Sequence, residues 1–319
     1  MKAAVLHAYG QIPQYDDLPK PQPQAGQVLI KLEAASIKQL DKLKASGKHY
    51  TRYDHFPVAV GVDGVGRLVS SGERVYAMGL TGMLADYALV NPEDCAPVPE
   101  AIDAALAAVL PNALLGSDAA LLYRADFQPG QTLLIHGATG VSGRMAVQAA
   151  RLRGAHKIIV TGRNAESLNY LRCLGADACI SLLDTPEQIV AQLSEIQQQS
   201  PLDVVLDYLW GEPTLWLLQA LNRHCPKPVR IITIGQMAGA DISLPSGLLR
   251  SKPISLSGSG LGSISSQQLR DYNQKQLGFM FEQAIQEKIT ADYRCYRLDA
   301  VEQAWQATLA PGERAVIKI

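Results

Sequence analysis

The spacing of apolar and polar residues changes twice along this chain. Up to about residue 100, short apolar runs alternate with turn residues. These runs are Lys2–His7, Val28–Ala35, Glu73–Met78 and Leu84–Val90. Short strands separated in this way predict a compact, mostly β unit. From about residue 104 the pattern becomes helical, and from about residue 131 strand-like and helical runs alternate, which predicts an α/β domain with a doubly wound parallel sheet.

The later elements can be placed from local signals. A threonine N-cap followed by proline, as at Thr185 and Pro186, marks a helix start. The predicted strands are 133–135, 157–161, 178–181, 203–206, 229–234 and 254–258, and the predicted helices after the second strand are 165–174, 186–199 and 213–221. The C-terminal elements, predicted over 267–287, 293–298, 300–309 and 315–319, have no place in that sheet. We therefore expect one domain to comprise residues 1–117 and 262–319, and a second to comprise 118–261.

One junction carries the clearest chemical signal. The segment Thr132–Gly154 reads TLLIHGATGVSGRMAVQAARLRG, an apolar strand that enters a glycine turn and continues into a helix. Gly137, Gly140 and Gly143 let the backbone come close to a ligand, because glycine lacks a Cβ and tolerates positive φ. Free N–H groups at the helix start can then donate hydrogen bonds to phosphate oxygens. We expect this turn to bind the pyrophosphate of a dinucleotide.

The end of the next strand indicates which dinucleotide binds. The residue that recognises the adenosine ribose stands roughly 20 positions after the glycine turn, and this chain has Thr161, Gly162, Arg163 and Asn164 there. A carboxylate would bond the ribose hydroxyls of NAD, whereas a guanidinium pairs with a 2′-phosphate and Thr161 or Asn164 adds hydrogen bonds. The sequence therefore favours NADP. The alternative is that Arg163 is a solvated surface cation.

Composition narrows the function classes. The 319 residues, 47% of them hydrophobic, suit two domains with sizeable cores. The 29 basic and 30 acidic residues give a net charge of −1 without long runs of one sign, so we expect a small-molecule substrate and neither a nucleic-acid nor a membrane partner. We find no signal peptide and no apolar run of the roughly 20 residues that span a bilayer, and we expect a cytoplasmic protein. The five cysteines and six histidines do not cluster, which argues against disulfides and a structural zinc site.

Several motifs in a fixed order give the chain a resemblance to a known family. They are the opening MKAAV, the segment PQAGQVLIKLEAASI, GVDGVG at 61–66, GERVYAM, HGATGVSGRMAVQ, LGAD, DVVLDYLWG, LDAVEQAW and GERAVIKI. The chain resembles the medium-chain dehydrogenase/reductases, and within them the zinc-free quinone oxidoreductases of the zeta-crystallin type. The resemblance implies a Rossmann-type domain inserted in a GroES-like, mostly β catalytic domain, with NADPH and substrate in a cleft between the two.

The resemblance also implies a set of cofactor contacts. The glycine turn would wrap the pyrophosphate, the end of the second strand would face the adenosine ribose, and the ends of two later strands would edge the nicotinamide through their backbone. The residues concerned are Thr139, Gly140, Val141, Ser142, Gly143, Thr161, Gly162, Arg163, Asn164, Gly235, Gln236, Ser259 and Gly260. Taken singly, Gly235 and Gly260 also suit ordinary turns.

The resemblance places two unusual residues where zinc-bearing relatives have metal ligands. Lys38 aligns with their cysteine and Val62 with their histidine, and neither an ammonium nor an isopropyl group coordinates zinc. We therefore expect no metal site. Hydride transfer builds negative charge on the acceptor oxygen, so the candidate catalytic residues are Lys38 as a cation and His49 and Tyr50 as proton donors. The alternatives are that Lys38 is solvated and that Tyr50 anchors a loop.

The sequence thus predicts an NADPH-dependent, zinc-independent oxidoreductase that transfers hydride to a quinone or another activated enone or carbonyl. Two alternatives stay open. One is an enoyl or acryloyl thioester reductase of the same superfamily, and the other is a non-catalytic NADPH-binding sensor or structural protein. By analogy with the family we expect a homodimer.

Overall fold

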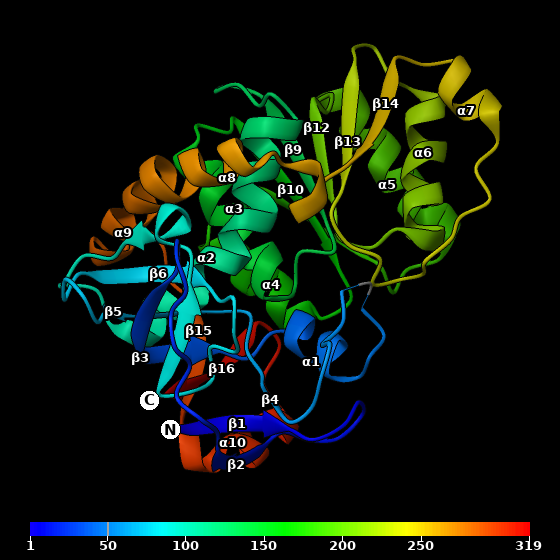
Figure 1. The fold of residues 1–319 in the computed structure, drawn as a ribbon. Coiled ribbons are helices and arrows are strands. Elements are labelled where there is room, and N and C mark those ends of the chain that lie inside the picture. Colours follow the sequence, from blue (N-terminus) through cyan, green and yellow to red (C-terminus); the bar gives the residue numbers. More distant parts are fainter. Residues whose placement is uncertain (50) are drawn as a thin grey trace. The chain divides into compact units, whose positions relative to one another are not determined.

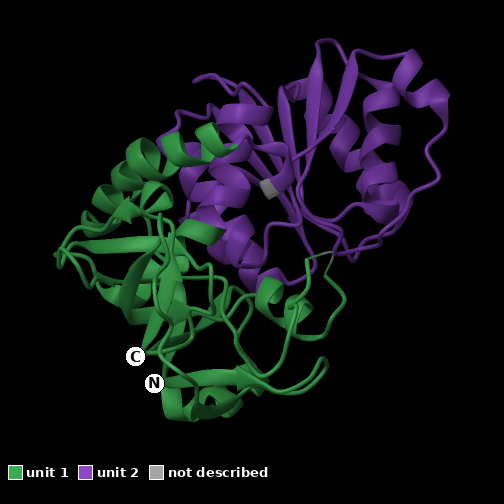
Figure 2. Ribbon diagram, in the orientation of Figure 1, with its two compact units in different colours: residues 1–112, 266–319 green, residues 113–265 purple. Residues whose placement is uncertain are grey.

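A computed structural model describes residues 1–49 and 51–319 of the chain, which divides into two compact units. Unit 1 comprises Met1–Asn112 and Ser266–Ile319, and unit 2 comprises Ala113–Ser265 (Figure 2). The predicted boundaries, after residues 117 and 261, lie within five residues of these limits. The chain therefore leaves unit 1 once and returns to it.

Unit 2 is built around a six-stranded parallel sheet (Figure 1). The strand order is β11-β10-β9-β12-β13-β14, which is the order of a Rossmann fold. The strands are β9 (Thr132–His136), β10 (Lys157–Gly162), β11 (Ala178–Ser181), β12 (Val204–Asp207), β13 (Val229–Thr233) and β14 (Ile254–Gly258). The predicted doubly wound parallel sheet is confirmed.

Both faces of this sheet are buried. Successive strand residues point to opposite faces, and in β9 Leu133 and Ile135 lie in one apolar core while Leu134 lies in another. Val147 joins the first core and Ile189 the second, so helices cover both faces. This explains why β9 reads as a continuous apolar run. The helices of unit 2 are α3 (Val141–Leu152), α4 (Ala165–Cys173), α5 (Pro186–Gln199), α6 (Gly211–Arg223) and α7 (Ser246–Arg250).

Unit 1 contains two further sheets. The larger has the order β15-β16-β3-β5-β6-β8 with β7 paired to β3, and the smaller has the order β2-β1-β4. The C-terminal strands join the larger sheet because β16 pairs antiparallel with β3 and parallel with β15. The strands are β1 (Lys2–Leu6), β2 (Gln14–Asp17), β3 (Val28–Ser36), β4 (Val58–Ala59), β5 (Asp63–Leu68), β6 (Arg74–Met78), β7 (Tyr87–Val90), β8 (Ala96–Pro97), β15 (Asp292–Arg297) and β16 (Glu313–Lys318).

The remaining helices differ in part from the sequence prediction. The helix predicted over 267–287 is α8 (Ser266–Asp271), a π-helical turn (Tyr272–Gln276) and α9 (Leu277–Ile285). Unit 1 also has α1 (Gln39–Ala45) and α10 (Val301–Gln306). The long helix α2 (Ala104–Ala119) continues into a π-helical turn that ends at Arg124. By length and composition alone this run of 21 residues could cross a membrane, which the sequence prediction overlooked, but 72% of its most apolar stretch is buried inside the protein, as in a core helix.

Candidate active site

The glycine turn joins β9 to α3 at the carboxyl edge of the parallel sheet. Gly137 has a φ of +89°, a value that favours glycine. Gly143 approaches the turn so closely that a Cβ there would lie 2.4 Å from the Cα and the carbonyl oxygen of Ala138. A Cβ on Gly140, in contrast, would meet no atom within 4 Å. The helix is thus packed tightly against the inner side of the turn, and space is left beside Gly140.

The start of α3 offers donors for an anion. Gly140 is the N-cap of this 12-residue helix, and no side chain caps it. The N–H groups of the first turn, from Val141, Ser142 and Gly143, point along the helix axis toward that end, where the helix dipole is positive. The next N–H, of Arg144, bonds the Gly140 carbonyl at 3.0 Å. An uncapped helix start beside open space fits a pyrophosphate.

Thr161 and Gly162, at the end of β10, support the turn. Thr161 is fully buried, its Oγ1 accepts the Gly137 N–H at 3.0 Å, and it lies 2.8 Å from His136 Nδ1. A Cβ on Gly162 would lie 2.3 Å from the Thr139 methyl group. The expected hydrogen bond from Thr161 to the ribose does not fit this geometry, because the hydroxyl is buried and already engaged. Thr161 instead fixes the conformation of the glycine turn.

Arg163 and Asn164 follow at the surface, and both are exposed. Asn164 is the N-cap of α4, where its Oδ1 accepts the Ser167 N–H at 2.7 Å. Among the residues that the structure describes, no carboxylate pairs with Arg163. Its guanidinium is therefore available to an anionic ligand beyond β10.

A pocket of about 320 Å³ lies at the carboxyl ends of β12 and β13. It is lined by Trp210, Thr233, Ile234, Gly235, Gln236 and Ala240. Gly235 has no room for a side chain, because a Cβ would lie 2.6 Å from the Tyr208 carbonyl oxygen. Gly235 and Gln236 were predicted from the resemblance, whereas Trp210 was missed. In the sequence, Trp210 is a bulky residue that follows a strand and precedes a glycine. This pattern is too common to indicate a ligand site.

The two predicted residues after β14 differ in their surroundings. Ser259 is buried, and its N–H bonds the Thr233 carbonyl at 2.8 Å, which ties it to the end of β13. The Gly260 N–H bonds Ser263 Oγ at 2.9 Å, and a Cβ on Gly260 would meet nothing within 4 Å. Space beside Gly260 is what a backbone contact to a ligand requires.

Lys38, the first candidate catalytic residue, lies buried in unit 1. Its side chain is 1% exposed. The ammonium donates to the Ser36 carbonyl at 2.7 Å and to Asp63 Oδ1 at 2.6 Å, and it lies 3.5 Å from Asp41 Oδ2. It also donates to Ser36 Oγ at 3.3 Å, so the three protons of the ammonium all have acceptors within the protein. The prediction of a direct contact between Lys38 and the substrate oxygen is therefore corrected: in this geometry Lys38 is a buried counter-ion.

The same residues fix the local backbone. Asp41 Oδ2 accepts the Lys38 backbone N–H at 2.7 Å, and its Oδ1 accepts the Val62 N–H at 2.8 Å. Asp41 thereby joins the start of α1 to the turn before β5. Tyr76 in β6 donates to Asp63 Oδ2 at 3.0 Å. We call Lys38, Asp41, Asp63 and Tyr76 the Lys38 cluster.

Burial governs the electrostatics of the Lys38 cluster. It raises the pKa of the Asp41 carboxyl, and the charge of Lys38 opposes this shift. Burial, followed by the charge of Asp63, holds the pKa of Tyr76 well above its usual value. Burial also lowers the pKa of Arg314, against the opposing charges of Asp63 and Asp41. Two carboxylates and two cations thus share this part of unit 1.

His49 and Tyr50 complete the predicted catalytic set. The Thr51 backbone N–H donates to His49 Nδ1 at 3.1 Å, and Thr51 Oγ1 lies 2.7 Å from the same nitrogen, so Thr51 fixes the orientation of the imidazole. Tyr50 lies outside the described residues.

Sequence reasoning overlooked the buried polar group of His136, Thr161 and Asp207, because the residues come from three strands far apart in the chain.

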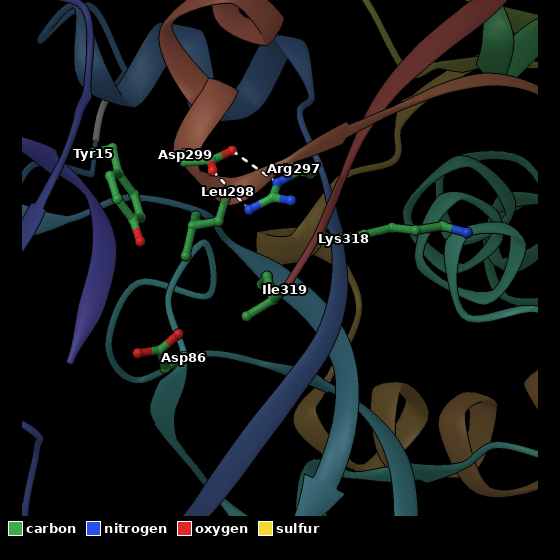
Figure 3. A pocket seen from close by; sticks show the side chains of 7 residues that line it. All are labelled: Tyr15, Asp86, Arg297, Leu298, Asp299, Lys318 and Ile319. Carbon is green, nitrogen blue, oxygen red and sulfur yellow. Dashed lines mark hydrogen bonds and ion pairs between the residues drawn. The ribbon is translucent and has the colours of Figure 1, made fainter.

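The described residues contain no metal-binding group, and unit 1 has a pocket of its own. Within residues 1–49 and 51–319, no three histidine, cysteine, aspartate or glutamate side chains form a group that could hold a metal ion. A second pocket of about 320 Å³, shown in Figure 3, contains an Arg297–Asp299 ion pair, and Lys318 points away from the other labelled side chains. It is lined by Tyr15, Asp86, Arg297, Leu298, Asp299, Lys318 and Ile319.

Comparisons with known proteins agree with the fold. Residues 142–275 match the family model described as zinc-binding dehydrogenase. The probable NADPH-dependent quinone reductase of Emericella nidulans is 27% identical over 99% of this chain and 99% of its own length. The putative quinone oxidoreductase of Bacillus subtilis is 33% identical over 60% of each chain. The crystal structure of the quinone oxidoreductase of Thermus thermophilus, described together with its NADPH complex, is 27% identical with a TM-score of 0.81 and covers 100% of each chain.

Over its whole length the chain is similar to quinone oxidoreductases, and these comparisons support a medium-chain dehydrogenase/reductase of the quinone oxidoreductase-like type. The resemblance read from the sequence motifs is thereby confirmed. The zinc-binding family model covers residues 142–275 only, so it does not include Lys38 or Val62. Neither the ammonium of Lys38 nor the isopropyl group of Val62 coordinates a metal ion.

Proposed function

We propose that this chain is an NADPH-dependent oxidoreductase that transfers hydride to a quinone or another activated enone or carbonyl without zinc. The observation that carries the proposal is the uncapped start of α3 beside the open space at Gly140, in a chain of the quinone oxidoreductase-like type. When bound, NADPH supplies the hydride. The residues of the chain bind and orient the cofactor and supply a proton to the acceptor oxygen.

Arg163 supports the preference for NADPH over NADH. The exposed guanidinium directly follows β10, where a carboxylate would stand in an NAD-specific site. A guanidinium forms bidentate, charge-assisted hydrogen bonds with a phosphate group. Asn164 contributes through the start of α4, whose N–H groups favour an anion nearby.

The Lys38 cluster supports the zinc-independent part of the proposal. Lys38 and Val62 cannot coordinate a metal ion. The Lys38 ammonium also supplies, between Asp41 and Asp63, the positive charge that these two carboxylates require. We therefore propose that Lys38 is a positioning residue, which holds α1 and the turn before β5 in place.

The acceptor oxygen still requires a proton. We propose His49 as its donor, because histidine is the most frequent general acid in active sites and Thr51 fixes the orientation of this imidazole. Tyr50, the neighbouring candidate, stays a prediction. The cleft between the two units, the cytoplasmic location and the homodimer also stay predictions.

A panel of acceptors tests the proposed function. The purified full chain is mixed with NADPH and a benzoquinone, a naphthoquinone, an alkenal or an enoyl thioester, and the absorbance of NADPH is followed. We expect turnover with a quinone or alkenal and none with the thioester. Turnover with the thioester alone would favour the reductase alternative, which has a precedent in the trans-enoyl reductase of Aspergillus terreus, 25% identical over 59% of this chain. Cofactor binding without turnover on any acceptor would refute the proposal that this chain is an enzyme.

Metal dependence is measured in the same assay. After dialysis against a chelator, the rate should stay unchanged, and added zinc should not raise it. A rate that falls with the chelator and returns with zinc would contradict the zinc-independent part alone. Replacement of His49 with Asn should lower kcat and leave the dissociation constant of NADPH unchanged.

A further inference from the structure

Trp210, between β12 and α6, has a backbone conformation that residues with a side chain rarely adopt. Its φ is +55° and its ψ is −160°. A positive φ brings Cβ into steric conflict with the backbone, and glycine alone avoids this conflict. Among the described residues, the non-glycine residues with positive φ are Asp126, Trp210 and Glu287, and Trp210 is the only aromatic one.

The surrounding structure holds this conformation. Asp207 is fully buried, and its Oδ1 accepts the N–H groups of Leu209 at 2.9 Å and of Trp210 at 3.1 Å. Its Oδ2 accepts the Thr214 hydroxyl at 2.8 Å. The Leu209 carbonyl in turn accepts the Ala238 N–H at 2.8 Å, which ties this loop to the loop after β13. A residue held in a strained conformation by its neighbours is a feature of ligand sites.

The position of Trp210 relates it to a ligand. Trp210 lines the pocket of about 320 Å³ together with Ile234, Gly235 and Gln236. This pocket lies at the carboxyl ends of parallel strands, where open α/β sheets bind their ligands. A glycine at position 210 would adopt the same backbone without conflict, so the backbone alone does not account for a tryptophan.

We propose that the Trp210 indole is the aromatic wall against which the nicotinamide ring of NADPH packs. This inference rests on the proposed function and deepens it. An indole face packs well against a planar ring, and it attracts a cation through its π-electrons. The oxidised nicotinamide carries a positive charge and the reduced ring does not. Trp210 therefore stabilises bound NADP⁺ more than bound NADPH.

Binding to variants of the full chain tests this assignment. Wild type, Trp210→Gly, Trp210→Ala and Trp210→Phe are titrated calorimetrically with NADPH, with NADP⁺ and with 2′,5′-ADP, which lacks the nicotinamide. We expect affinity for NADPH to fall about tenfold in the Gly and Ala variants, affinity for NADP⁺ to fall further, and the Phe variant to keep most of both. Affinity for 2′,5′-ADP should not change. Trp216→Phe, half-buried in α6, is the matched control and should bind all three ligands like the wild type.

Thermal unfolding of the same variants without ligand separates the backbone from the side chain. Both the Gly and the Ala variants lack the indole, but only glycine relieves the positive φ. The Gly variant should therefore melt about 2–4 °C above the Ala variant, although both lose NADPH affinity equally. An Ala variant as stable as the Gly variant would contradict the strain on which the inference depends.

The outcomes distinguish this inference from the proposed function. A wild type that binds neither NADPH nor 2′,5′-ADP would refute the proposed function itself. A wild type that binds both, with Gly and Ala variants that bind NADPH and NADP⁺ equally well, would refute the role of Trp210 alone. A parallel loss of 2′,5′-ADP affinity would also refute it, because the effect would then not be specific to the nicotinamide ring.

Discussion

Replacement of Lys38 with Met tests whether the Lys38 cluster is held together by charge. The side chains of Lys38, Asp41 and Asp63 are at most 1% exposed, so water cannot screen the charges that remain after the substitution. Breaking a buried ion pair by removing one partner costs about 3–5 kcal/mol. The unpaired carboxylate can escape this cost by taking up a proton. The loss of unfolding free energy then cannot exceed the free energy of protonating the carboxylate. That free energy is about 4 kcal/mol at pH 7, for an aspartate with an ordinary pKa of about 3.9 in the unfolded chain.

The sign of the pH dependence follows from the same argument. In the variant, an aspartate of the cluster has a higher pKa in the folded protein than in the unfolded chain. The penalty therefore falls as the pH falls, to about 1.5 kcal/mol at pH 5. Urea unfolding of wild type and Lys38→Met at pH 7 and pH 5 should show the difference in unfolding free energy shrink by more than half.

Two further variants make this experiment decisive. Adding Asp63→Asn to Lys38→Met removes the unpaired charge and keeps an acceptor for the Tyr76 hydroxyl, so it should recover most of the lost stability at pH 7. The control is Lys48→Met at an exposed position just after α1, which should change stability by less than about 0.5 kcal/mol. A loss below about 1 kcal/mol for Lys38→Met, or a loss that is equal at both pH values, would refute the reasoning.

Two other predictions concern the glycine turn and the buried histidine below it. Gly143→Ala should lose about 1–3 kcal/mol of stability in urea unfolding, because its Cβ would meet backbone atoms of Ala138 at 2.4 Å. Gly140→Ala should keep the fold and weaken NADPH binding, which calorimetry measures. Equal stability of the two variants would contradict the packing argument. Burial lowers the pKa of His136, against the charge of Asp207, so the contribution of His136 to stability is present above about pH 6.5 and is lost as the pH falls from there. His136→Asn should therefore flatten the decline of the unfolding free energy that the wild type shows between about pH 6.5 and 5, whereas His156→Asn, at an exposed position, should not. An unchanged slope in His136→Asn would contradict this prediction.

The sequence predicted those parts of the molecule that depend on local patterns. The parallel strands are apolar on both faces, and Thr185 and Gln188 form the capping box that starts α5, so these elements could be placed without tertiary information. The glycine turn was recognisable because Gly137 and Gly143 are sterically required. Each of these signals lies within one continuous segment.

The remaining features arise from contacts between segments far apart in the chain. Lys38 was expected to act on the substrate, but Asp63, 25 residues later, pairs with its ammonium in the folded unit. Thr161 was expected at the ribose, but Gly137, 24 residues earlier, occupies its hydroxyl. The backbone strain at Trp210 depends on hydrogen bonds to the buried Asp207 carboxylate. No spacing in the sequence gives these pairings.

The central claim is that this chain binds NADPH through the start of α3 and through Arg163. Calorimetric titration of the purified wild type, Arg163→Ala and Arg172→Ala with NADPH and NADH tests it most directly, since Arg172 is another exposed cation, on α4. We predict that the wild type binds NADPH at least tenfold more tightly than NADH, that Arg163→Ala loses this preference, and that Arg172→Ala retains it. Equal affinity of the wild type for the two cofactors, or binding of neither, would contradict the account.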